Sequence, residues 1–158
     1  MDLLKGKILK KNREQEIAKF WQAKEQEIGE QIRGKDMCEY LGGYNDLKQR
    51  AWGLLYFTDN SLYAQIYTQK NWWTTLFGSG QGVTARETIQ FQIPWNMVKY
   101  IHLPPKKNVF LSIFTAPDYR VNIKYAQDGL ESILVLLIYS RSTREKFLKC
   151  FQDYHHIS

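Results

Sequence analysis

WGLLYFTDNSLYAQIYTQ (residues 52–69) points most directly to the fold, because it indicates two strands joined by a tight turn. In its second half Leu62, Ala64 and Ile66 alternate with more polar positions, the period of a strand with one buried face. The Asp-Asn pair at 59–60 is typical of turns. The stretch therefore predicts a β-hairpin.

Further strands are predicted on both sides of this hairpin. Pro94 interrupts one alternating stretch, which we expect to continue as a single bent strand. The stretch 130–139 is apolar enough to be a central strand, and Asp128-Gly129 predicts a turn before it. The seven predicted strands cover residues 37–41, 52–58, 61–69, 88–103, 109–115, 119–125 and 130–139.

The chain returns to a helical pattern near its end. Ser142 to Glu145 matches a capping box, in which the serine hydroxyl and the glutamate carboxylate bind free backbone amides of the first helical turn. Phe147 and Phe151 follow at helical spacing with Leu148 and Tyr154. This amphipathic pattern predicts a C-terminal helix that covers an apolar surface.

The first 33 residues also predict helix, since they lack proline and are rich in Lys, Glu and Gln. The polar run 10–16 favours two helical pieces, and Gly34 is the expected stop. Mixed charges on the polar face favour packing over membrane insertion. The apolar stripe, expected to pack on this chain or to join two copies as a homo-oligomer, comprises Ile17, Phe20, Trp21, Ile28 and Ile32.

Seven antiparallel strands followed by a capped helix resemble the pleckstrin-homology-like superfamily. WGLLYFTDNSLY (52–63) and IQFQIPWNMVKYIHLP (89–104) are similar to two motifs of its GRAM branch. The resemblance implies an α+β fold: a seven-stranded, partly open antiparallel β-barrel capped by a C-terminal helix. We expect this domain over residues 36–158, with an N-terminal helical extension over 1–35. A cone-shaped sheet of the nuclear-transport-factor-2 type, with a pocket, is the alternative.

Composition limits the function classes without naming one. The chain of 158 residues has 22 basic and 16 acidic side chains, a net charge of +6. No block of like charge is present, so nucleic acid is not the expected partner. Two cysteines without a metal-ligand spacing favour a reduced compartment. With no secretory signal in the opening residues, the predicted location is cytoplasmic, with peripheral membrane attachment as a second form.

Three basic residues form the first candidate site. In pleckstrin-homology domains that bind phosphoinositides, cations spread over the first two strands converge on the headgroup phosphates. Lys35, Lys48 and Arg50 fit that pattern loosely here. We expect them to bind a lipid headgroup or another anion if they converge, and to be solvated otherwise.

The second candidate site is the aromatic loop KNWWTTLFGSGQG (70–82). If it is exposed, it forms an apolar patch of the kind that contacts a protein partner or a membrane. If it folds back, it covers the sheet. The residues concerned are Trp72, Trp73, Leu76 and Phe77.

Catalytic and metal-binding motifs are weak. The glycines of 78–82 precede a predicted strand, whereas a phosphate-binding loop precedes a helix. His102 stands alone, and no nucleophile, base or metal-ligand pattern is recognisable. We therefore expect no cofactor, no metal and no enzymatic activity. The sequence predicts a binding module for a protein partner or an anionic membrane surface; a small enzyme or ligand-binding protein is the alternative.

Overall fold

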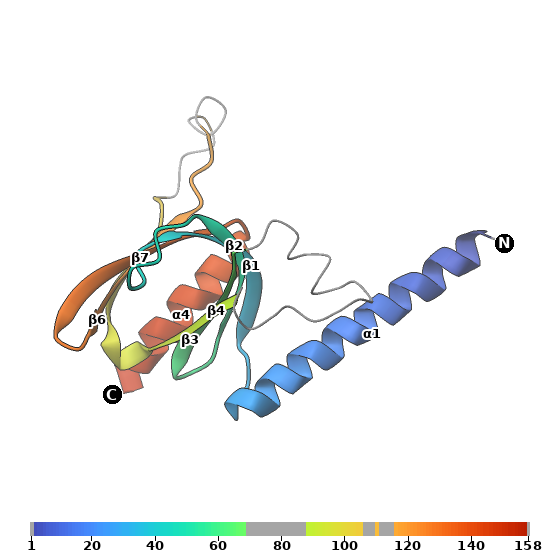
Figure 1. Ribbon diagram of the computed structural model, residues 1–158, viewed down its shortest axis with the longest axis horizontal. Helices are drawn as coiled ribbons and strands as arrows, with labels where there is room; N and C mark the ends of the chain where they lie inside the picture. Colours follow the sequence, from blue (N-terminus) through green and yellow to red (C-terminus); the bar gives the residue numbers. More distant parts are fainter. Residues whose placement is uncertain (1, 69–87, 106–109, 111–115, 158) are drawn as a thin grey trace. The chain divides into compact units, whose positions relative to one another are not determined.

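The computed structural model describes residues 2–68, 88–105, 110 and 116–157. The chain forms two compact units, Met1–Ile32 and Arg33–Ser158. The first consists of a helix and the residues that follow it. The second contains the whole β-sheet and the C-terminal helix (Figure 1).

Helix α1 spans Asp2–Ile28 without a break, so the prediction of two pieces is wrong. The Lys, Arg, Glu and Gln residues of the polar run are good helix formers and extend the helix through it. The helix stops at Gly29, whose φ of 70° lies in the left-handed region that favours glycine. Gly34, the predicted stop, instead begins the first strand.

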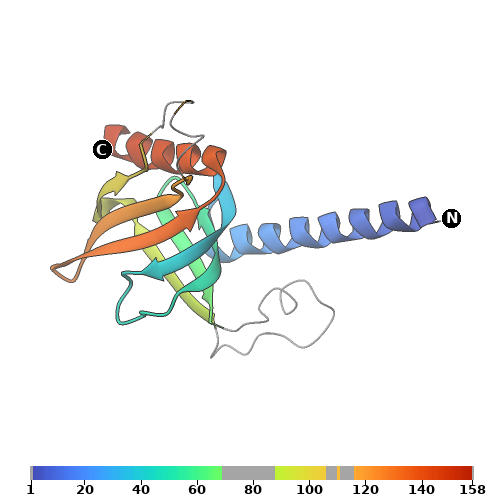
Figure 2. The same cartoon turned by 90° about the horizontal axis from the view of Figure 1, so that it is seen from above.

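Seven antiparallel strands form one sheet in the order β4-β3-β2-β1-β7-β6-β5. The sheet curves but is not closed, since β4 and β5 are its two edges (Figures 1 and 2). The strands are β1 Gly34–Gly42, β2 Ala51–Phe57, β3 Ser61–Tyr67, β4 Thr88–Pro94, β5 Val98–His102, β6 Arg120–Gln127 and β7 Leu130–Ile138.

The predicted bent strand 88–103 is two strands. A short helix, η2 (Trp95–Met97), separates them, and β4 pairs with β3 whereas β5 pairs with β6 at the opposite edge. Pro94 has no amide hydrogen to continue the ladder, and the buried indole of Trp95 donates to the Thr58 carbonyl at 3.1 Å. The predicted strand 109–115 lies outside the described residues except for Phe110, which is 77% exposed.

Local turn chemistry explains the hairpins. Between β2 and β3 the Thr58 hydroxyl accepts hydrogen bonds from the amides of Asn60 and Ser61, both at 3.1 Å. Between β6 and β7, Asp128 and Gly129 have φ values of 52° and 79°, the conformation of a two-residue hairpin turn. Both predicted turns are confirmed.

Helix α4 (Arg141–Ile157) lies across one end of the curved sheet (Figure 2). Its N-cap is Ser140, whose hydroxyl accepts from the Thr143 amide at 3.3 Å. The predicted cap at Ser142 is therefore two residues too late, and the Glu145 carboxylate binds the Arg141 guanidinium at 2.9 Å. This (i, i+4) pair lies on the exposed helix surface.

The core lies between the concave face of the sheet and α4. Phe147 of α4 is fully buried and contacts Phe57 and Trp95 edge-on, with ring centroids 5.3 and 5.4 Å apart. The inner sides of the strands supply the other core residues, among them Leu55, Leu62, Ile66, Ile93, Ile123, Leu134, Leu136 and Ile138. An open seven-stranded antiparallel sheet with a helix over one end is the predicted α+β, pleckstrin-homology-like architecture.

Candidate functional site

The three predicted basic residues do not converge on one site. Lys35 is aligned with Tyr56, whereas Tyr40, five residues further along β1, is aligned with Ala51 at the other end of the hairpin. At about 3.3 Å per strand residue, Lys35 lies roughly 17 Å from the end that carries Lys48 and Arg50. Lys48 and Arg50 are both exposed in the connection between β1 and β2.

Arg50 is bound by a buried carboxylate. Its Nε and Nη2 donate to Oε1 and Oε2 of Glu39 at 2.5 and 2.9 Å. The Glu39 side chain is only 10% exposed, and Oε2 also accepts from the Tyr139 hydroxyl at 2.9 Å. The hydrogen bond from Arg50 is the main reason why the pKa of Glu39 is lowered, with Tyr139 adding to it. Much of the Arg50 charge is therefore compensated within the protein.

Around Glu39 three aromatic rings follow one another across the outer face of the sheet. Trp52 of β2 stacks on Tyr139, which follows β7, with centroids 5.8 Å apart. Tyr139 in turn contacts Tyr119, which precedes β6, at 4.9 Å. We call Trp52, Tyr139 and Tyr119 the aromatic ladder. The strand order β2-β1-β7-β6 arranges its rings in that sequence across the sheet.

The aromatic ladder is exposed and held in place. Trp52 and Tyr139 are 37% and 41% exposed. The Tyr139 hydroxyl donates a hydrogen bond to Glu39, and the Arg144 guanidinium lies over the Tyr119 ring at 5.6 Å from its centroid. Burial and the Glu39 carboxylate together raise the pKa of Tyr139, so the hydroxyl keeps its proton and remains a donor.

The sequence analysis did not identify this surface. It interpreted 130–139 as a central strand, and β7 is indeed central, but its outer face is not fully covered: Ile133 is exposed, and Val135 and Leu137 are only half-buried. The available signal was that both alternating faces of 130–139 are apolar. Only one of them faces the core.

The second predicted contact set, Trp72, Trp73, Leu76 and Phe77, lies outside the described residues. Its exposure stays a prediction.

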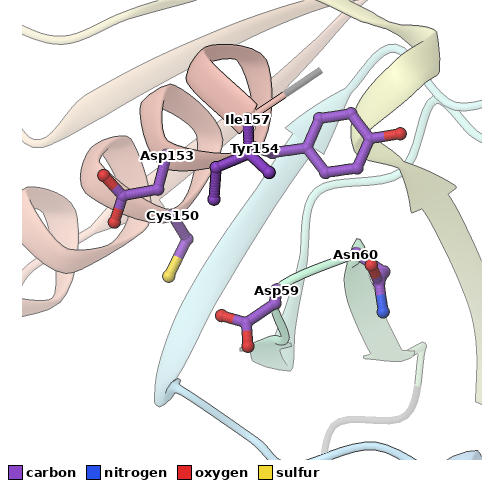
Figure 3. A pocket seen from close by; sticks show the side chains of 6 residues that line it. All are labelled: Asp59, Asn60, Cys150, Asp153, Tyr154 and Ile157. Atoms are coloured by element: carbon purple, nitrogen blue, oxygen red, sulfur yellow. The ribbon is translucent and has the colours of Figure 1, made fainter.

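A pocket of about 230 Å³ lies at the α4 end of the domain, between the β2–β3 turn and the last turns of α4 (Figure 3). Asp59 at its edge forms a two-pronged pair with Arg33, with the closest contact, from Nη2 to Oδ2, at 2.6 Å. The residues that line it are Asp59, Asn60, Cys150, Asp153, Tyr154 and Ile157.

The chemistry of this pocket does not favour nucleophilic catalysis. Burial raises the pKa of Cys150, and the nearby carboxylates of Asp59 and Asp153 raise it further. A thiol must lose its proton to act as a nucleophile. His102 is at the exposed end of β5, and within the described residues no three His, Cys, Asp or Glu side chains gather as metal ligands.

Within the described ranges, neither α1 nor α4 has an apolar stretch long enough to cross a bilayer.

No family model and no curated protein matches this chain. Among solved structures, the C-terminal domain of an unknown protein from Leishmania infantum is 11% identical, with a TM-score of 0.49 over 88% of this chain and 98% of that one. The hSac2 domain of human phosphoinositide phosphatase Sac2 is also 11% identical, with a TM-score of 0.49 over 89% and 78%. The DH/PH domains of p115-RhoGEF are 8% identical, with a TM-score of 0.44 over 80% and 31%.

Proposed function

We propose that this chain is a binding module of the pleckstrin-homology-like type that docks a protein partner through the aromatic ladder. The observation that carries the proposal is the exposure of Trp52 and Tyr139, which stack on each other while the buried Glu39 carboxylate holds the Tyr139 hydroxyl. Exposed aromatic rings expose apolar surface to water, and such surfaces mark contact sites. We further propose that the module is of the GRAM-like branch and works as a non-enzymatic adaptor in the cytoplasm.

The composition of the surface favours a protein over a lipid. Trp, Tyr and Arg are the residue types that contribute most binding energy in protein interfaces, and the ladder and its surroundings contain Trp52, Tyr139, Tyr119 and Arg144. A headgroup site needs several uncompensated cations close together. Arg50 is bound to Glu39, and Lys35 lies at the far end of the hairpin.

The test compares two binding assays on the same variants. Partners cross-linked to the purified chain are identified, and each purified partner is then titrated calorimetrically against wild type, Trp52→Ala and Tyr100→Ala. Tyr100 is the matched control, because it is an exposed aromatic residue on β5, 47% accessible, that lies outside the ladder. We expect Trp52→Ala to weaken binding by about 30-fold, the effect of removing a contact worth about 2 kcal/mol, and Tyr100→Ala to leave it unchanged.

The lipid alternative is tested by sedimentation with vesicles of phosphatidylcholine, with and without phosphatidylserine. The proposal predicts equal, negligible binding to both. Salt-sensitive binding to the anionic vesicles that is lost in Lys48→Ala with Arg50→Ala would show a membrane module instead. Partner binding that is insensitive to Trp52→Ala would also overturn the proposal.

A further inference from the structure

Helix α1 has one face with the spacing of a helix that packs lengthwise against another helix. In an α-helix of about 3.6 residues per turn, positions that alternate in steps of four and three lie along one line. The helix is continuous over this region (Figure 1). The residues on this line, which we call the α1 seam, are Lys10, Glu14, Ile17, Trp21, Lys24 and Ile28.

The middle of the α1 seam offers apolar surface to a second helix. Ile17 and Trp21 are half-buried, so each still exposes part of its side chain to water. Phe20 lies beside the seam and contacts the Trp21 ring edge-on, with centroids 5.1 Å apart. Lys24 is buried, and its ammonium group binds Glu27 of the same helix at 2.7 Å. Covering the exposed apolar area with a second helix would stabilise the pair.

The charges on α1 differ before and after these apolar residues. Three exposed cations precede them: Lys10, Lys11 and Arg13. None of the three forms an ion pair or a hydrogen bond within the described part of the chain. Two carboxylates follow: Glu25, whose Oε1 accepts from the Ile32 amide at 2.9 Å, and Glu27, whose side chain is 57% exposed. The helix is therefore complementary in charge to itself read in reverse.

Complementarity to its own reverse is what a twofold-symmetric pair of antiparallel helices requires, because each contact is repeated with the roles exchanged. We align Ile17 of one copy with Trp21 of the second. Cations and carboxylates on the same side of the seam then face each other, offset by about 3 Å along the helix axis. The flanking pairs that this alignment creates between the copies are Arg13 with Glu27 and Lys11 with Glu25.

A parallel pair of α1 helices is disfavoured by the same seam. It would align each seam residue with its own counterpart, so that Lys10 meets Lys10 and Glu14 meets Glu14. Like charges placed against each other across an interface repel. The antiparallel alignment instead places Lys10 beside Ile28, where the lysine stem can pack, and Glu14 beside Lys24. No layer of the antiparallel seam joins like charges.

We propose that α1 pairs with α1 of a second copy of this chain, in an antiparallel homodimer. The apolar middle of the α1 seam forms the centre of the contact. Ion pairs from the cationic segment of each copy to the carboxylates of the other flank it. The inference goes beyond the proposed function and does not depend on it, because it concerns α1 and not the aromatic ladder.

The test is sedimentation equilibrium of the full chain. We expect a reversible monomer–dimer equilibrium that shifts towards monomer as salt is added, because the flanking pairs are exposed and screened. Arg13→Glu and Glu27→Arg each place two like-charged pairs in the dimer, so each should weaken dimerisation at least about tenfold. Lys19→Glu is the matched control, because Lys19 is exposed on the opposite side of α1 and the change of charge equals that of Arg13→Glu. It should dimerise like wild type.

An equimolar mixture of the Arg13→Glu and Glu27→Arg variants tests the antiparallel alignment. In the mixed dimer both pairs between positions 13 and 27 again join opposite charges. The mixture should therefore dimerise to within severalfold of wild type, although neither variant does so alone. A parallel dimer does not bring these two positions together, so mixing would restore nothing.

A wild-type chain that remains monomeric at about 100 µM would overturn the inference and indicate that the α1 seam packs within its own chain. Dimerisation that Arg13→Glu does not weaken would show that another surface joins the copies. Loss of dimerisation that mixing does not restore would contradict the antiparallel alignment. Circular dichroism of each variant excludes loss of the helix as the cause.

Discussion

The two ends of the β1–β2 hairpin each carry an arginine bound two-pronged by a carboxylate, yet the two pairs differ in burial. At one end Arg33 binds Asp59, whose side chain is 61% exposed. At the other end Arg50 binds Glu39, whose side chain is 10% exposed and also accepts from Tyr139. The same chemistry is a solvated surface pair in one place and the support of an aromatic surface in the other.

The largest effect on stability is expected not at either ion pair but in the core that α4 covers, at the Asp59 end of the domain. Phe147→Ala removes a fully buried ring that contacts Phe57 and Trp95. The free energy of unfolding, measured by urea titration, should fall by about 3–5 kcal/mol. At the other end, Trp52→Ala removes a partly exposed ring and should cost about 1 kcal/mol or less.

That contrast tests the assignment of the two ends. If Trp52→Ala destabilises the domain as much as Phe147→Ala, then Trp52 belongs to the core and the ladder is a structural feature. If its effect is small while partner binding is lost, stability and binding reside at opposite ends of the hairpin.

The second effect concerns Glu39 and depends on pH. Because its pKa is lowered in the folded protein, Glu39 contributes stability above the ordinary glutamate pKa of about 4.3, and this contribution is lost as the pH falls through the folded value. Glu39→Gln should therefore lower the urea midpoint at pH 7. The difference from wild type should narrow as the pH falls from 7 towards 3, because protonation makes the wild-type Glu39 side chain neutral like that of glutamine.

A constant difference between pH 7 and pH 3 would contradict this account and indicate that the substitution acts through packing. Glu131→Gln is the matched control, since Glu131 also pairs with a cation, Lys124, but has a side chain that is 55% exposed. Exposed pairs contribute little to stability, so its urea midpoint should stay close to that of wild type at both pH values.

The sequence predicted those parts of the fold that local chemistry decides. The β2–β3 and β6–β7 turns depend on Thr58, Asn60, Asp128 and Gly129, which lie within or beside the turns themselves. The division of 88–103 was missed, because it depends on pairing of β4 and β5 with strands far apart in the sheet. A local sequence pattern does not indicate with which other strand a given strand will pair.

The candidate site was beyond local patterns for the same reason. Tyr139 binds Glu39 across 100 residues, and Arg50 binds it across 11. The sequence analysis predicted that Arg50 binds an anionic ligand, but it could not show that Arg50 is already paired with the carboxylate of Glu39 in the structure. Alternation placed Trp52 in a strand without showing whether its face is covered.

The smallest effect on stability is expected at the exposed ion pair between Arg33 and Asp59. The reactivity of Cys150 provides a more sensitive measurement there. Asp59→Asn should leave the urea midpoint almost unchanged, because exposed ion pairs contribute little to stability. Its measurable consequence is at Cys150: burial raises the pKa of that thiol and Asp59 raises it further, so removing the carboxylate should lower the pKa. Alkylation by iodoacetamide at pH 8 should then be faster than in wild type, because the thiolate is the reactive form.

Cys38 does not obscure this measurement, since complete burial raises its pKa to about 12. Asp153→Asn is the matched variant, because Asp153 is the other carboxylate that raises the pKa of Cys150 and it pairs with no arginine in the described part of the chain. It should accelerate alkylation in the same direction without touching the Arg33 pair. If Asp59→Asn instead lowers the urea midpoint as far as Glu39→Gln does, the exposed pair is as important to the fold as the buried one. Burial would then not be what separates the two ends of the hairpin.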